Sequence, residues 1–104
     1  MGGFDWDEEN LTHIARHGVE ADEAEQVVAD AVVLGKEERA GELRYRLVGE
    51  TSKGRVLVVV VTLVGDLSGV EWPRVITAWD ADKKLRRYWR AFQRRQSDGG
   101  ENNG

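Results

Sequence analysis

The sequence predicts a single α+β domain, in which two short helices precede a four-stranded antiparallel sheet and a further helix follows it. Three observations predict this class. Apolar residues recur at helical spacing near both ends of the chain. Between them the apolar pattern changes to the period of two that is typical of strands. The connections within that middle part are short, and helices grouped on either side of a run of hairpins indicate α+β.

The first part of the chain is expected to be mostly helical. Gly2 to Trp6 fits a short edge strand. Asp7 is a suitable N-cap for a helix that runs to His17, and Gly18 can adopt the positive φ that ends it. A second helix is predicted over Ala21 to Ala29, with an acidic outer face. We expect the helices of the chain to cover one face of the sheet.

Four strands follow, and the predicted ranges are Val32 to Glu38, Leu43 to Glu50, Arg55 to Leu63 and Glu71 to Trp79. The third range is Val-rich on both faces, which predicts that it is the central strand. Pro73 cannot donate to a ladder, so it is expected at a strand start or an edge position.

The second strand alternates most clearly. Leu43, Tyr45 and Leu47 would lie on one side of it. Its other side would carry Arg44 and Arg46 together with Val48. Because side chains at i and i+2 share a face, the two arginines are expected next to each other.

The segment 74–95 joins the fourth strand to a strongly basic helix. Leu85, Trp89 and Phe92 form the apolar stripe of that helix and are predicted to be core. Its remaining surface carries Lys83, Lys84, Arg86, Arg87, Tyr88, Arg90, Arg94 and Arg95. Residues 1–96 are expected to form the domain, and 97–104 a disordered tail with nothing apolar to bury.

Charge is divided unevenly along the chain. The net charge is −4, but residues 1–42 hold 12 acids and 3 bases (−9), and residues 43–104 hold 7 acids and 12 bases (+5). Cysteine is absent, which excludes a disulfide framework and fits a reducing cytoplasm. The longest apolar run, Val56 to Val64, is about half the ~20 residues of a membrane span, so no membrane association is expected.

Metal chemistry has little support in the sequence. His13 and His17 are four residues apart and share a helix face, which is half of a metal site. No cysteine or third histidine completes it. We therefore expect no metal and no cofactor.

Basic and aromatic residues are the densest functional candidates. If Arg44, Arg46, Arg55 and Arg74 on the strands converge with Lys83, Arg86, Arg87 and Tyr88 on the last helix, they form a surface suited to a phosphodiester backbone. Guanidinium groups would stabilise charge on phosphate oxygens during RNA cleavage. A general base is also needed, and the sequence leaves open Glu37, Glu38, Glu50, Asp80 and His17.

An ordered set of short motifs resembles the BrnT toxins. The set begins with Phe4-Asp5-Trp6-Asp7-Glu8-Glu9, Arg16-His17-Gly18-Val19 and Glu23-Ala24. It continues with Arg44-Tyr45-Arg46-Leu47-Val48-Gly49, the strand Arg55 to Val61, and Arg74-Val75-Ile76-Thr77-Ala78 followed by Arg86-Arg87-Tyr88. The resemblance covers roughly residues 4 to 90.

The resemblance implies a RelE-like ribonuclease fold and the toxin of a type II toxin–antitoxin pair, a metal-independent endoribonuclease that inhibits translation. By position, the implied catalytic residues are Arg74, Arg86, Arg87 and Tyr88, with Asp80 as a further candidate. The RNA-binding candidates are Arg44, Arg46, Arg55, Lys83 and Arg90. The chain departs from the family pattern at Asn10-Leu11 and at Trp79-Asp80, where many members carry an Arg-Lys pair.

Three functions are compatible with the sequence. The first is an RNA-cleaving toxin. The second is a RelE-like domain that binds its antitoxin or a nucleic acid without efficient catalysis. The third is an α+β interaction module whose basic helix binds an acidic partner. The first two imply a BrnA-like ribbon-helix-helix antitoxin as partner, with the toxin monomeric when free and part of a hetero-oligomer in the complex.

Overall fold

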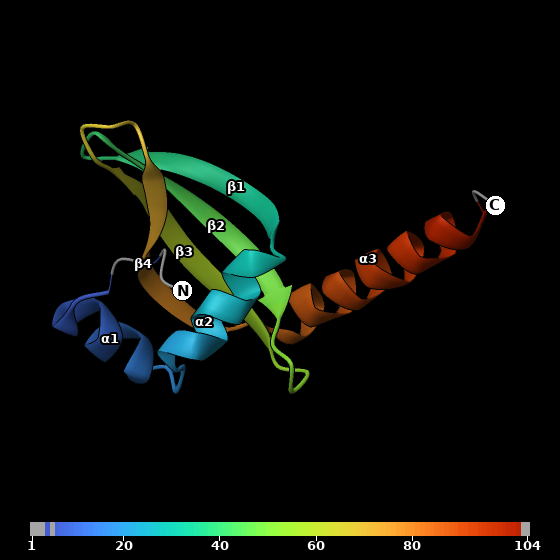
Figure 1. The fold of residues 1–104 in the computed structure, drawn as a ribbon. Helices are drawn as coiled ribbons and strands as arrows, with labels where there is room; N and C mark the ends of the chain where they lie inside the picture. Colours follow the sequence, from blue (N-terminus) through green and yellow to red (C-terminus); the bar gives the residue numbers. More distant parts are fainter. Residues whose placement is uncertain (1–3, 5, 103–104) are drawn as a thin grey trace.

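The computed structural model describes residues 4 and 6–102 and confirms the predicted α+β order (Figure 1). The elements are α1 (Glu8–Ala15), α2 (Ala21–Ala29), β1 (Val32–Arg39), β2 (Glu42–Glu50), β3 (Val56–Gly65), β4 (Glu71–Asp80) and α3 (Lys83–Asn102). The strands form one antiparallel sheet in the order β1-β2-β3-β4. Most of the strand expected over Gly2 to Trp6 lies outside the described residues, whereas Phe4 and Trp6 pack against the core.

The caps of α1 explain where this helix begins and ends. Asp7 is the N-cap, as predicted, and its Oδ1 accepts a hydrogen bond from the Asn10 backbone N–H at 2.8 Å. The helix ends at Ala15 rather than at His17, because the chain then turns through Gly18, whose φ is 71°. α2 has the predicted bounds.

The strand β3 is the interior strand that its composition predicts. It pairs with β2 on one side and with β4 on the other. Leu57 and Val59 are buried on one face of the sheet, and Val56 and Val58 are buried on the other. Pro73 lies in the edge strand β4, opposite Leu63, as expected for a residue that cannot donate to the ladder.

The helices α1 and α2 cover one face of the sheet, which we call the closed face. Ile14 of α1 and Ala24 and Val27 of α2 are buried there with Leu57 and Val59. Gly49 allows α2 to approach closely, because a Cβ at this position would lie 3.0 Å from Val27 Cγ1 and 3.1 Å from the Val27 carbonyl oxygen.

The expectation that all helices cover the same face is wrong for α3. Trp89 is buried against Val48, Val56 and Val58 on the opposite face, with Leu85 and Phe92 packed around it. The apolar ends of β2 and β3 require cover on this face, and the chain turns towards it after β4, where the Ala81 N–H donates to the Val56 carbonyl at 3.0 Å. The predicted core stripe of the helix is confirmed.

Only the first turns of α3 contact the sheet, and the helix then runs away from it (Figure 1). The backbone is helical to Asn102, past the predicted domain end at residue 96, so the assignment of 97–104 as a disordered tail stays a prediction. Because α3 covers only one end of its face, the rest of that face is open.

Candidate functional site

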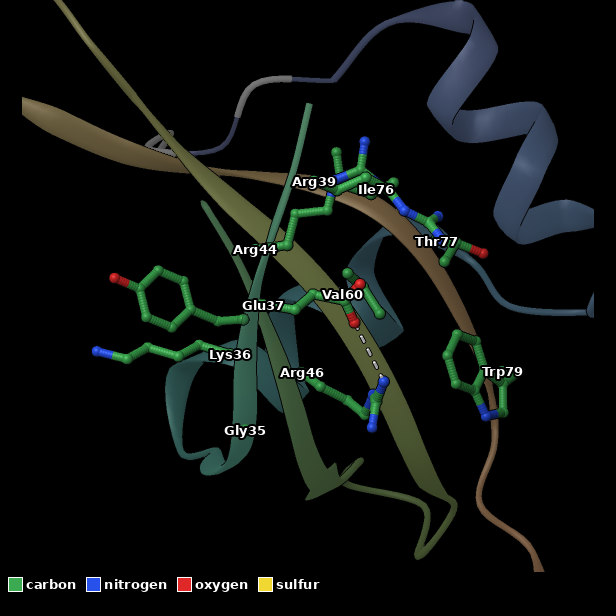
Figure 2. A pocket seen from close by; sticks show the side chains of 11 residues that line it. Gly35, Lys36, Glu37, Arg39, Arg44, Arg46, Val60, Ile76, Thr77 and Trp79 are labelled. Atoms are coloured by element: carbon green, nitrogen blue, oxygen red, sulfur yellow. Dashed lines mark hydrogen bonds and ion pairs between the residues drawn. The ribbon is translucent and has the colours of Figure 1, made fainter. Parts of the chain in front are cut away.

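The uncovered part of the sheet, which we call the open face, contains a cavity of about 500 Å³ (Figure 2). This volume is within the range of small-ligand sites, ~300–1,000 Å³. The cavity is lined by Gly35, Lys36, Glu37, Arg39, Arg44, Tyr45, Arg46, Val60, Ile76, Thr77 and Trp79. All four strands therefore contribute to it.

Strand register explains why these side chains meet. Arg46 of β2 is opposite Val60 of β3, which is in turn opposite Thr77 of β4. Residues two positions away along a strand share the face, so Arg44 follows Arg46, and Trp79 follows Thr77 in the other direction. The cavity thus has a cationic end on β1 and β2 and an aromatic end on β4.

At the cationic end, one carboxylate lies among several arginine side chains. Glu37 Oε1 lies 3.5 Å from Arg46 Nη2, and both side chains are about half exposed. Arg44 Nε donates to Glu42 Oε1 at 2.9 Å. Arg39 follows Glu37 by two positions on β1 and also lines the cavity. Exposed ion pairs of this kind stabilise by only ~0–1 kcal/mol, so an incoming anion can replace the carboxylate partners.

The predicted RNA-binding residue Arg55 lies outside this cavity and links three elements. Its guanidinium donates to both oxygens of Asp80 (2.8 and 3.0 Å), to Glu23 Oε1 (2.9 Å) and to the Gly18 carbonyl (2.8 Å). The hydrogen bonds to Asp80 raise the pKa of Arg55 above its usual value. The same hydrogen bonds from Arg55 lower the pKa of Asp80, which makes this carboxylate a poor proton acceptor.

Arg74 is also absent from the cavity lining. Its guanidinium donates to the Asp7 carboxylate and, at 3.4 Å, to Asn10 Oδ1, and so connects β4 to the start of α1. The pKa of Asp7 is lowered, chiefly by the Asn10 backbone N–H and then by Arg74. The sequence predicts Arg74 on the same sheet as Arg44, but no local pattern indicates that the start of α1 supplies a carboxylate for it.

The candidates on α3 do not reach the cavity lining. Arg86 donates to the Ala81 carbonyl at 3.0 Å, and Arg90 donates to Glu50 Oε2 at 3.1 Å. Glu50 Oε1 accepts from Trp89 Nε1 at 2.9 Å, so this possible base holds α3 against the sheet. Lys83, Arg87 and Tyr88 are exposed. Their catalytic and RNA-binding roles stay predictions.

The structure therefore divides the predicted site into separate groups. Of the residues predicted from the sequence, it brings Arg44 and Arg46 together in the cavity. It adds Arg39, Thr77 and Trp79, which were not predicted as site residues from the sequence, and Lys36 borders the cavity but is directed away from it (Figure 2). For Arg39 a signal was available, since it follows Glu37 by two positions on β1 and therefore shares its face, but the pairing of β1 with β2 was needed to interpret it.

The remaining base options lie away from the cavity lining. His17 is exposed in the turn after α1, and Glu38 is exposed on β1 between two residues that line the cavity. Among the residues that the structure describes, no three His, Cys, Asp or Glu side chains are grouped to hold a metal ion. Across the same residues, no helix is long and apolar enough to cross a membrane.

The arrangement combines charges suited to one kind of ligand. Guanidinium groups fork onto phosphate oxygens and stay charged at any physiological pH. A carboxylate placed among them can accept a proton beside a bound phosphate. The open face can therefore bind a phosphodiester and offer it a base.

Comparison with known proteins agrees with the resemblance in the sequence. Residues 6–84 match the family described as the ribonuclease toxin, BrnT, of a type II toxin–antitoxin system. Comparison with curated proteins gave no match. The matched range includes the whole sheet and ends at the start of α3, so Arg86, Arg87 and Tyr88 lie beyond it. The match spans well over half of the 104 residues, and the chain belongs to the BrnT family of ribonuclease toxins of type II toxin–antitoxin systems.

Proposed function

We propose that this protein is a RelE-like, metal-independent endoribonuclease that cleaves RNA on the open face and thereby inhibits translation. The observation that carries the proposal is the position of Glu37 among Arg39, Arg44 and Arg46 in one cavity. These three guanidinium groups supply the positive charge that a metal ion supplies in other nucleases. Membership in a ribonuclease family supports the same reaction.

In the proposed reaction, Glu37 accepts the proton of an RNA 2′-hydroxyl. The 2′-oxygen then forms a bond to the adjacent phosphorus, and the bond from phosphorus to the 5′-oxygen breaks. Arg44 and Arg46 stabilise the charge on the phosphate oxygens during this step. The departing 5′-oxygen takes a proton from water, to which the cavity is open, and the hydroxide left behind removes the proton from Glu37. The products are a 2′,3′-cyclic phosphate and a free 5′-hydroxyl.

A type II toxin has an antitoxin partner, and the open face suggests how the partner acts. We expect a ribbon-helix-helix, BrnA-like antitoxin that places acidic and apolar side chains on the cationic cavity and on α3. Dimerisation would come from the antitoxin, with the free toxin monomeric. The natural site of action would be the cytoplasm, where the RNA substrate is found.

A second candidate function is a domain that binds its antitoxin or RNA with little catalysis. It is favoured by the ion pairs that engage two of the expected catalytic residues. Asp80 is held by Arg55, and Arg74 is held by Asp7 and Asn10. If those two residues carried the reaction in the family, the groups would need to be released here before they could act.

The test compares two adjacent glutamates on β1. Glu37→Gln removes the carboxylate of the cavity, while Glu38→Gln is the matched control, because Glu38 is exposed and does not line the cavity. Each protein is expressed without its antitoxin in a bacterium, and the purified protein is incubated with RNA in EDTA. We expect growth arrest and cleavage for the wild type and for E38Q. For E37Q we expect a 10²–10⁴-fold lower cleavage rate.

The outcomes separate the two candidate functions and test the details of the proposed reaction. Cleavage by wild-type protein that persists in E37Q removes Glu37 as the base. Normal growth and intact RNA with folded wild-type protein would support the binding domain instead. Loss of cleavage in EDTA alone would contradict metal independence. Products that end in a 3′-phosphomonoester with no cyclic intermediate would contradict the attack by the 2′-oxygen.

A further inference from the structure

Trp79 stands at the aromatic end of the cavity, away from the cations. It is opposite Val58 in the sheet, and it packs against the core that holds Val48 and Trp89. It also lines the cavity together with Thr77 and Arg46. One part of the indole is therefore fixed by core packing, and another part is presented to the cavity.

The indole N–H of Trp79 is available to a ligand. Trp6 Nε1 donates to Glu25 at 2.7 Å, and Trp89 Nε1 donates to Glu50 at 2.9 Å. Trp79 Nε1 has no hydrogen-bond partner among the residues that the structure describes. The described part of the chain also contains no buried, unpartnered side-chain nitrogen or oxygen. Trp79 Nε1 is consequently in contact with solvent.

The distance from the aromatic end to the cationic end fits a nucleotide. Trp79 is on β4 and Arg46 is on β2, two strand spacings away, which is about 10 Å between backbones. Both side chains extend over this gap. Figure 2 shows Arg46 directed to the side of the cavity where Trp79 lies, whereas Lys36 is directed away from it. The cavity of about 500 Å³ is large enough for one nucleotide.

We propose that Trp79 is a base-stacking residue, against which the cavity holds one nucleobase of single-stranded RNA while Arg44 and Arg46 bind the adjoining phosphates. The inference rests on the proposed function for its substrate class. An aromatic ring and cations on one sheet face form the combination that binds single-stranded nucleic acid, because every base has a π-face that can stack. A paired base has its faces covered by its neighbours and cannot enter the cavity.

The experiment measures binding rather than cleavage. The probes are a fluorescein-labelled 2′-O-methyl pentaadenylate, which has no 2′-hydroxyl to react, and an abasic pentamer with the same backbone. Trp79→Leu keeps an apolar side chain over Val58 but removes the ring, and Trp79→Phe keeps a ring. Trp72→Leu is the matched control, since Trp72 is on the same strand but does not line the cavity. Thermal unfolding of each variant checks its fold.

We expect W79L to bind pentaadenylate about tenfold more weakly than the wild type, as loss of one stacked base predicts. W79F and W72L should stay within about threefold of the wild type. On the abasic pentamer, W79L and the wild type should bind equally, because no base is present to stack. This comparison isolates the interaction between the indole and a base.

Any of the following results would overturn the proposal. One is unchanged binding of pentaadenylate by W79L, and another is an equal loss on both probes, which would assign Trp79 to folding or to phosphate binding. The third is absence of any binding by the wild type. Displacement of pentaadenylate by a pentaglutamate peptide at equal concentration would also overturn it, because it would assign the cavity to an acidic protein partner. Base-dependent binding without RNA cleavage would support stacking on Trp79 and contradict the proposed ribonuclease activity. RNA cleavage without base-dependent binding would support the ribonuclease activity and contradict stacking on Trp79.

Discussion

The closed and open faces are built from alternate residues of the same strands, yet they serve different purposes. On the closed face, Leu57, Val59 and Val75 are completely buried beneath α1 and α2. On the open face, the residues that alternate with them include Val60 and Thr77, which are only partly buried and line the cavity. Because side chains alternate between the two faces, a single strand supplies both buried core residues and residues that line the cavity.

The difference also shows how one short domain can hold a cationic site. Burial of a guanidinium group without a partner is costly, so the arginines require a solvent-accessible face. Here α3 covers only the apolar end of this side of the sheet, where Trp89 packs against Val58, and leaves the open face beside it. Arg44 and Arg46 lie beyond that end and remain accessible.

The largest expected effect tests whether stability is confined to the closed face. Leu57→Ala should lower the free energy of unfolding by about 3 kcal/mol, because it leaves a cavity in a site that is fully buried. Val60→Ala changes a partly buried residue of the same strand on the open face, and it should lower the free energy of unfolding by about 1 kcal/mol or less. Urea unfolding followed by circular dichroism measures both. Equal losses would show that the open face is as closely packed as the closed one.

Much of this division could be predicted from the sequence. The alternation in β2 placed Leu47 and Tyr45 on one face and Arg44, Arg46 and Val48 on the other, and the structure confirms it: Leu47 and Tyr45 pack with the core of the closed face, although Tyr45 also borders the cavity. The apolar run of β3 likewise indicated an interior strand. These features are local, since neighbouring positions on one strand determine them.

What the sequence could not predict depends on contacts between distant segments. The pairing of Arg74 with Asp7 joins residues from β4 and from the start of α1. The Arg55–Asp80 pair joins the beginning of β3 to the end of β4. The same limit explains the wrong expectation for α3, because an apolar stripe shows that a helix packs but not on which face. For the same reason, the sequence could suggest that all the basic residues converge, and only the tertiary structure shows that they lie in separate groups.

A second, smaller effect compares two glycines on opposite faces. Gly49→Ala places a Cβ 3.0 Å from Val27 Cγ1, so α2 must shift and we expect a loss of about 1–3 kcal/mol. Gly35→Ala is the matched control, because a Cβ there has nothing within 4 Å and Gly35 lines the open cavity. Thermal unfolding of both variants measures the difference. A stable G49A protein would mean that α2 is not held closely against β2.

The smallest expected effect concerns the ion pair in which Arg55 binds Asp80, away from the cavity of the open face. Arg55 lowers the pKa of Asp80 below its unfolded value of 3.8. Folding therefore favours the ionised carboxylate, and the stabilisation is complete at pH values above 3.8 and is lost as the pH falls through the lower, folded pKa. Because the Asp80 side chain is 55% exposed, solvent screening limits the contribution to about 0.5 kcal/mol.

Asp80→Asn should consequently unfold at a lower urea concentration than the wild type at pH 6, and the two midpoints should approach each other as the pH falls below about 3.8. E38Q provides the comparison, since Glu38 is exposed and makes no ion pair within the described residues. Activity gives the second measurement. If Asp80 only holds Arg55 in place, D80N retains cleavage at its wild-type pH dependence, because the amide still accepts one hydrogen bond from the guanidinium. If D80N instead loses cleavage as E37Q is expected to, the proton acceptor lies at the junction of β4 and α3, and the open face would bind RNA without supplying the base.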